Sequence, residues 1–144
     1  MKIEMDSLAK AYAKEQIEIK ASAKKVYAIL SDINNWPSWQ SSVKKAAISG
    51  PVEENKEFKW KAGGMKINSK LHTVNSPSQL GWTGRIGWII AVHNCTITES
   101  DGENVVVVEE SLKGFLSGTM KKSLREGMLR NLEELKFSTE MNRK

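Results

Sequence analysis

The chain has 144 residues and a formal net charge of +5 at pH 7, with 40% hydrophobic and 27% charged residues. These values are ordinary for one soluble globular domain, and no apolar run approaches the roughly 18 residues that a membrane-spanning helix requires. The single cysteine, Cys95, excludes a disulfide within the chain and suits a reducing compartment, so we expect a cytoplasmic protein.

The positive charge is scattered, and acidic residues are interleaved with the basic ones. Nucleic-acid binding needs a concentrated basic stripe, preferably with exposed aromatic rings, so we expect no nucleic-acid partner. Residues 1–6 carry acidic side chains where a signal peptide would need an apolar core. Residues 1–11 show no strong packing pattern and are interpreted as an N-terminal extension.

The first predicted elements are one strand and two short helices. Residues 16–20 alternate polar and apolar side chains, as a half-buried strand does. Ser22 fits the N-cap of a helix over residues 23–31. A second short helix is predicted at residues 35–39, where Pro37 suits a first turn.

A hairpin follows, with strands over 56–62 and 65–74 joined by a Gly63-Gly64 turn. Pairing across this turn gives one apolar, aromatic face and one charged face, so the register is self-consistent. The pairs on the apolar face are Ala62 with Met65, Trp60 with Ile67, and Phe58 with Ser69. The same register places His72 on the wet face.

The next strand is predicted over 79–86, where the glycines beside Trp82 let the strand bend or leave room. Residues 91–99 and 105–112 then form a second hairpin around an Asp101-Gly102 turn. Its inward pairs are Ile97 with Val106, Cys95 with Val108, His93 with Glu110, and Ala91 with Leu112.

The last predicted element is one long helix over residues 117–137. Its apolar stripe consists of Met120, Leu124, Met128, Leu132 and Leu135, bordered by Gly127 and Asn131. A glycine inside a helix costs about 1 kcal/mol relative to alanine. Gly127 therefore indicates either close approach to the sheet or space left for a ligand. A methionine stripe of this kind fits plain core packing as well as an adaptable binding surface.

Five tryptophans in a chain of this size are interpreted as the wall of an apolar pocket, with ordinary core packing as the alternative. They are Trp36, Trp39, Trp60, Trp82 and Trp88.

His93 and Glu110 are the one polar pair predicted to face inward. Such a pair can orient a ligand or act as general acid and base, and a purely structural hydrogen bond in the sheet is the alternative. Cys95 at an apolar position is interpreted as an inert core thiol rather than a nucleophile. The two histidines and the cysteine are not close to one another in sequence or register, so we expect no metal and no cofactor.

Several short segments carry a resemblance to a known family. They are Ile19–Ala23 with Val26, Trp36–Trp39, Leu80–Trp82, Gly87–His93, Glu109–Ser111 with Gly114, and Leu132–Lys136. Over about residues 12–140, which we take as a single domain, the sequence resembles the SRPBCC superfamily, the START-like and polyketide cyclase/dehydrase-like group, and specifically its small bacterial members. The expected fold is the α+β helix-grip arrangement. In that arrangement a curved antiparallel β-sheet wraps around a long C-terminal α-helix, and two short helices lie between the first and second strands.

The resemblance implies binding of a hydrophobic or amphipathic small molecule or lipid in an internal cavity, sometimes with cyclase, dehydratase or hydrolytic chemistry. Two hypotheses stay open: a non-catalytic binder, and a polyketide cyclase/dehydratase-like enzyme that uses His93 and Glu110 as an acid–base pair. An interaction module would instead need an exposed apolar patch. We expect no stable membrane insertion.

Residues expected to line the cavity come from the sheet and the last helix. Relatives often carry an aromatic residue at the position of Cys95, so this pocket is expected to be larger or differently shaped. The expected ligand-binding residues are Trp39, Phe58, Trp60, Ile67, Leu71, Trp82, His93, Cys95, Glu110, Met120, Leu124, Gly127 and Met128.

Overall fold

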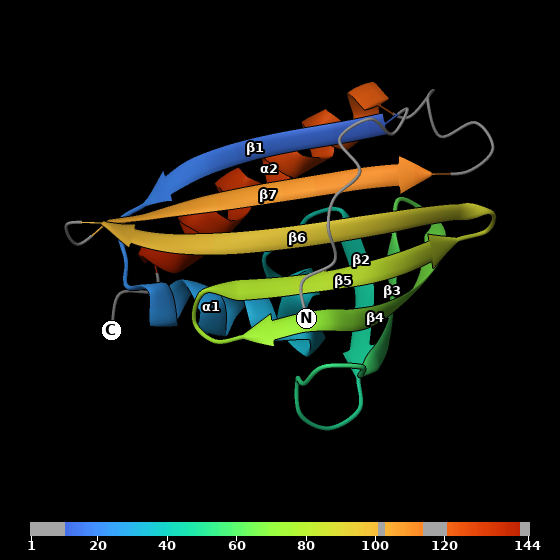
Figure 1. Ribbon diagram of the computed structural model, residues 1–144, viewed down its shortest axis with the longest axis horizontal. Helices are drawn as coiled ribbons and strands as arrows, with labels where there is room; N and C mark the ends of the chain where they lie inside the picture. The colour runs from blue at the N-terminus through green and yellow to red at the C-terminus, as the bar shows by residue number, and fades with distance from the viewer. Residues whose placement is uncertain (1–10, 101–102, 114–120, 142–144) are drawn as a thin grey trace.

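The computed structural model describes residues 11–100, 103–113 and 121–141 as one antiparallel sheet with helices on its concave side (Figure 1). The strand order is β1-β7-β6-β5-β4-β3-β2. The elements are β1 (Ala11–Ile19), α1 (Ala23–Ser31), the 3₁₀ helix η1 (Ile33–Ser38), β2 (Val43–Ile48), β3 (Glu57–Ala62), β4 (Met65–Asn75), β5 (Gln79–Ile86), β6 (Ile89–Ser100), β7 (Glu103–Lys113) and α2 (Lys121–Met141). This arrangement confirms the helix-grip fold.

The two short helices between β1 and β2 are confirmed. The Ser22 side chain accepts a hydrogen bond of 3.2 Å from the backbone N–H of Lys25, and α1 begins at the next residue. Asp32 separates α1 from η1, which buries Trp36. The Trp36 indole N–H donates to the backbone oxygen of Leu30 at 2.9 Å, so the second helix is fastened to the end of the first.

Both predicted hairpin registers are confirmed. Residues of β3 and β4 pair as Ala62 with Met65, Trp60 with Ile67, and Phe58 with Ser69. In the second hairpin β6 and β7 pair as Ala91 with Leu112, His93 with Glu110, Cys95 with Val108, and Ile97 with Val106. The registers were predictable because side chains alternate between the two faces of a strand, and only one register buries the apolar set.

One strand was missed by the sequence prediction, and two element ends differ from it by four residues or more. The short strand β2 was missed because Lys44 and Lys45 are both exposed and the register shifts between Val43 and Lys45, which breaks the alternation. Strand β1 begins at Ala11 rather than residue 16, because small alanines give no hydrophobic pattern. Helix α2 continues to Met141, beyond the predicted end at residue 137, and its predicted first turn lies outside the described residues.

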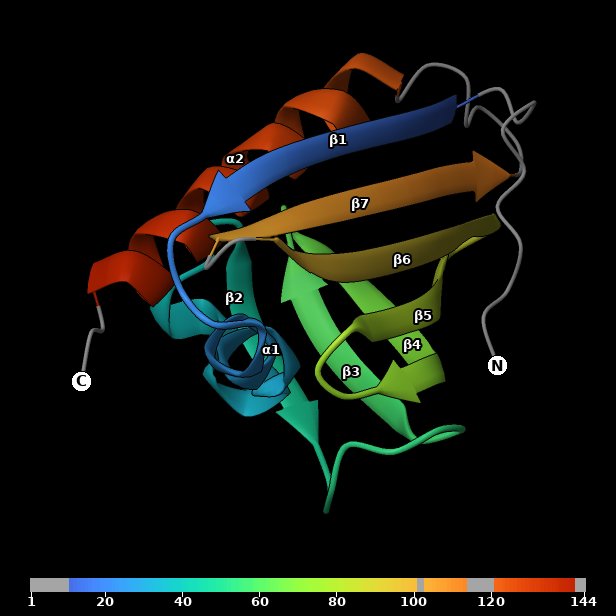
Figure 2. The same ribbon diagram turned by 60° about the vertical axis from the view of Figure 1, so that its left-hand side comes forward.

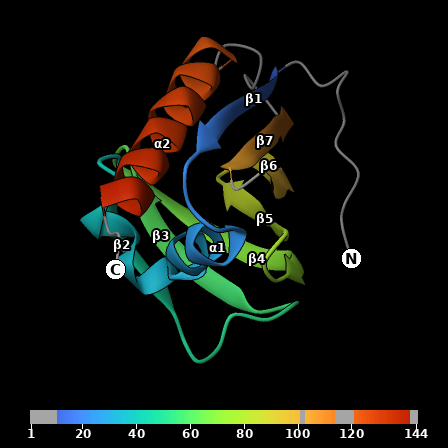
Figure 3. The same ribbon diagram turned by 90° about the vertical axis from the view of Figure 1, so that its left-hand side faces the viewer.

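The interior lies between the concave face of the sheet and the helices, which Figures 2 and 3 show on the same side of the sheet. One part of it is solidly packed beneath α1 and η1. We call this part the filled half, and it consists of Val26, Ile33, Phe58, Leu71, Leu80, Ile97 and Val106, all buried. No helix among the described residues is long and apolar enough to cross a membrane.

Candidate functional site

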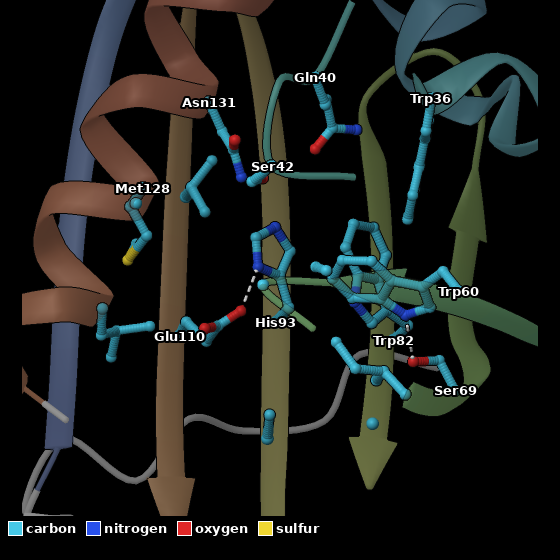
Figure 4. Close-up of a pocket in the computed structure, with 18 of the residues that line it drawn as sticks. Trp36, Gln40, Ser42, Trp60, Ser69, Trp82, His93, Glu110, Met128 and Asn131 are labelled. Atoms are coloured by element: carbon cyan, nitrogen blue, oxygen red, sulfur yellow. Dashed lines mark hydrogen bonds and ion pairs between the residues drawn. The ribbon is translucent and has the colours of Figure 1, made fainter. Parts of the chain in front are cut away.

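A cavity of about 300 Å³ occupies the rest of the interior, between the sheet and α2 (Figure 4). Strands β3 to β7 supply one wall, the segment 39–42 supplies an end, and α2 supplies the opposite wall. We call this part of the interior the hollow half. Protein interiors are normally packed to crystal-like density, so a space of this size is a feature of the fold rather than a packing defect.

Tryptophan rings form the aromatic side of the cavity. The Trp36 ring lies 5.4 Å from that of Trp60 and 5.2 Å from that of Trp82, measured between ring centroids. The Trp60 indole N–H donates to the Ser69 hydroxyl at 3.0 Å, so its polar edge is satisfied and its faces remain apolar. Trp39 also lines the cavity.

Trp88 is an exception that corrects the sequence interpretation. Its side chain is 85% exposed, and it lies in the two-residue turn between β5 and β6. Gly87 adopts a φ of +59° there, so the chain reverses before Trp88 can take a place on either face of the sheet. Trp88 is therefore not part of the cavity wall.

His93 and Glu110 come together in the hollow half. His93 Nδ1 and Glu110 Oε1 are 2.7 Å apart, and the His93 ring stacks on Trp82 with centroids 4.3 Å apart. Both side chains line the cavity (Figure 4). When Nδ1–H donates to the carboxylate, Nε2 carries the lone pair and can accept a proton or a hydrogen bond. The pair can thus anchor a ligand or move a proton.

A second set of polar side chains lines the cavity, and the sequence analysis did not predict it. Gln40, Ser42 and Asn131 line the cavity across from His93, from the segment after η1 and from α2 (Figure 4). Within the described part of the chain, Asn131 Oδ1 and the indole N–H of Trp39 are buried without a hydrogen-bond partner. Asn131 could have been found, because it is a polar residue at the border of an apolar helical stripe.

Most of the expected lining residues border the cavity. Ile67, Cys95, Leu124, Gly127 and Met128 do so in addition to the tryptophans, His93 and Glu110 described above.

Three of the residues that were expected to line the cavity are not among the described residues that line it. Phe58 and Leu71 are on the inward face but belong to the filled half, because alternation along a strand sets the face and not what lies above it. Met120 lies outside the described residues.

His72, on the outer face, is half-buried rather than at the surface, and its ring lies against Gly81, where an added Cβ would come within 2.6 Å of it.

Small residues account for the empty space. A Cβ added at Gly127 would meet nothing within 4 Å, so this glycine leaves space and does not mark close helix–sheet contact. Cys95 is 2% exposed, and burial raises the pKa of its thiol to about 12. A thiol with that pKa is not a nucleophile at neutral pH. Among the described residues, no group of three His, Cys, Asp or Glu side chains gathers that could hold a metal ion.

Comparison with known proteins places the chain among similar folds. The model of a family described as polyketide cyclase / dehydrase and lipid transport matches residues 10–138. No curated protein matches the sequence.

Solved structures with the same fold share little sequence with the chain. A hypothetical protein from Helicobacter pylori has a TM-score of 0.81 at 13% identity, covering 92% of this chain and 90% of that one. A START superfamily protein from Mycobacterium smegmatis has a TM-score of 0.77 at 15% identity, with coverages of 90% and 97%. The Zhui aromatase/cyclase from Streptomyces sp. R1128 has a TM-score of 0.73 at 11% identity, with coverages of 90% and 93%. At these identities the likeness shows the fold alone.

Proposed function

The chain belongs to the polyketide cyclase / dehydrase and lipid transport family, and from this premise we propose that it binds a hydrophobic or amphipathic small molecule or lipid in the hollow half. The observation that carries the proposal is the cavity itself. Its wall is mainly apolar and aromatic, with a few polar groups. That composition is typical of pockets for small organic ligands.

The cavity also indicates the size and character of the ligand. About 300 Å³ is near the lower end of the range for ligand pockets, roughly 300 to 1,000 Å³, so the ligand is small. Polar groups lie on opposite walls, with the His93–Glu110 pair on the sheet and Asn131 on α2. A ligand that satisfies both has an apolar body and a hydrogen-bonding group at each side.

Filling the hollow half tests the proposal directly. Gly127→Leu places a side chain into the cavity from α2, whereas Glu126→Leu adds the same side chain at the neighbouring exposed position. The probe is N-phenyl-1-naphthylamine, a neutral apolar fluorophore. We expect Gly127→Leu to weaken its binding at least about fivefold, since overpacking costs on the order of 1–3 kcal/mol. Glu126→Leu should bind as the unchanged chain does.

Equal probe affinity in the two leucine variants, both folded by circular dichroism, would contradict binding in this cavity. The natural ligand is sought separately by native mass spectrometry of protein purified from its own host. Absence of any co-purifying compound together with no binding of apolar probes would also count against the proposal.

A second candidate is an enzyme of the cyclase or dehydratase kind. The specific observation in its favour is the hydrogen bond of 2.7 Å between His93 and Glu110 at the cavity wall. In this role Glu110 fixes the His93 tautomer, and His93 Nε2 takes a proton from a carbon next to a ketone and returns it to the leaving oxygen.

The chemical test uses a poly-β-keto thioester analogue and follows the loss of one water by mass spectrometry. His93→Gln retains a hydrogen-bonding side chain but cannot act as a base. Retained ligand affinity with lost turnover would support catalysis. Retained affinity with retained turnover, or no turnover by the unchanged chain, would dismiss this pair as catalytic.

A further inference from the structure

The cavity reaches the surface at one identifiable place. Of the residues that line it, Gly63, Met65 and Ser123 are also exposed. Gly63 and Met65 lie at the turn between β3 and β4, and Ser123 lies in the first turn of α2. The mouth of the hollow half is therefore between this turn and the start of α2.

Exposed apolar side chains stand beside this mouth. Strand β4 pairs with β5 as Asn68 with Arg85, near the start of β4 and the end of β5, so Met65 and the turn that holds Trp88 are at the same end of the sheet. Ile90 follows on β6 at the same end of the sheet, on the outer face, because its neighbour Ala91 faces the cavity. Met65, Trp88 and Ile90 are 40%, 85% and 37% exposed, and we call these three residues the rim. Figures 1 and 2 show the β5–β6 turn at the same end of the molecule as the start of α2.

The charge around the rim is almost entirely positive. In the described segments 61–68, 84–91, 111–113 and 121–126, the acidic residue is Glu126. The basic residues of those segments whose side chains the structure describes are Lys61, Lys66, Arg85, Lys113, Lys122 and Arg125, and of these Arg125 is paired with Glu15 and Lys113 also has an interaction partner. At the opposite ends of the strands the charges are mixed: the acidic residues Glu53, Glu54, Glu57, Glu99 and Glu103 lie there together with the basic residues Lys20, Lys56 and Lys70. The rim therefore lies in a cationic part of the surface.

We propose that the rim docks on the surface of an anionic lipid bilayer, with the cavity mouth facing the membrane. Tryptophan favours the interface between headgroups and acyl chains, where its ring is buried and its N–H stays hydrated. Each basic residue near an anionic surface contributes about 1 kcal/mol to binding. Three apolar side chains are too few for stable anchoring, so docking is reversible. Docking of this kind does not depend on which ligand the cavity holds.

Vesicle flotation tests the proposal with matched variants. The vesicles are phosphatidylcholine alone, or phosphatidylcholine with phosphatidylglycerol. Trp88→Ser removes the exposed ring, and its control is Phe137→Ser, which removes a ring that is 69% exposed near the other end of α2. Lys66→Glu/Arg85→Glu reverses two charges beside the rim, and its control is Lys24→Glu/Lys25→Glu on α1.

We expect the unchanged chain to float with anionic vesicles and not with neutral ones. Reversal of the two rim charges should weaken binding by at least about 25-fold, about fivefold for each charge, while both controls float normally. Tryptophan fluorescence should shift to shorter wavelength on anionic vesicles, and the shift should vanish in Trp88→Ser because the other four tryptophans are buried or half-buried.

Three results would overturn the proposal. The first is equal binding to neutral and anionic vesicles, or to neither. The second is equal loss of binding in the rim variants and their controls. The third is a concentration-dependent dimer of the unchanged chain that Trp88→Ser abolishes in sedimentation without vesicles, which would assign the rim to a second copy of the chain.

Discussion

The filled half and the hollow half share one sheet and are both lined by inward-facing side chains, yet only one is solid. In the filled half large apolar residues such as Phe58 and Leu71 meet α1 and η1, and aromatic rings lie edge to face. In the hollow half several inward positions hold small residues, including Ala91, Cys95 and Gly127. The empty space is therefore encoded by side-chain size at particular inward positions, while the alternation of polar and apolar residues is the same throughout.

The largest expected effect is on stability, and it compares one leucine-to-alanine substitution in the filled half with one in the hollow half. Leu71 and Leu132 are 0% and 3% exposed, but Leu132 borders the cavity and Leu71 does not. Replacement of a buried leucine by alanine costs about 2–5 kcal/mol, with the cost rising with the cavity created. We expect Leu71→Ala to lie near the top of this range and Leu132→Ala near the bottom, measured by urea unfolding. Equal losses would mean that the hollow half is as well packed as the filled half.

The second prediction concerns whether water reaches the Cys95 thiol in the hollow half. Burial raises the pKa of the Cys95 thiol from 9.0 to about 12, so the native state holds this proton more tightly than the unfolded chain does. The contribution to stability is complete below pH 9 and is lost as the pH rises towards 12. Between pH 8 and pH 11 the unchanged chain should therefore lose about 2–3 kcal/mol more than Cys95→Ala. Parallel pH profiles of the two chains would indicate that water reaches the thiol.

Replacing Gly127 and Gly84 by alanine should change the unfolding free energy in opposite directions. A Cβ at Gly127 meets nothing within 4 Å, so Gly127→Ala should raise the unfolding free energy by about 1 kcal/mol. A Cβ at Gly84 would lie 2.9 Å from the Ser69 hydroxyl, which accepts the Trp60 N–H. Gly84→Ala should therefore lower stability by about 1 kcal/mol or more. Thermal unfolding measures both, and a change of the same sign in both would contradict this geometry.

The smallest effect on stability is expected for a residue outside both halves. Trp88→Ser changes a side chain that is 85% exposed, so the unfolding free energy should change by less than about 0.5 kcal/mol. A loss like that of a buried tryptophan would show that the ring packs against the protein in solution.

The fold could be predicted from the sequence where pattern and turn chemistry agree. The Gly63-Gly64 turn and the alternation around it determined the register of β3 with β4, and the same reasoning placed His93 opposite Glu110. Strand β2 could not be found this way, because its register shift next to Val43 interrupts the period of two.

The site was only partly predictable, because position on the inward face does not determine distance from the helices. Phe58 and Trp60 are two residues apart on the same face, yet Phe58 lies in the filled half and Trp60 borders the cavity. Gln40 and Ser42 follow a 3₁₀ helix in a segment without periodicity, so their place at the cavity depends on where η1 ends. Trp88 was misplaced because composition counts aromatic rings but does not show which of them falls in a turn.

Strand β1 pairs with β7, so that Tyr12 lies beside Ser111, residues about a hundred positions apart in the chain. Joining chain segments that far apart costs on the order of 4 kcal/mol in loop-closure entropy, which is recovered only when both strands and α2 are present. A nascent chain on the ribosome therefore exposes the aromatic wall to water until its final helix emerges. The proposed ligand therefore has a complete pocket only after α2 has been synthesised.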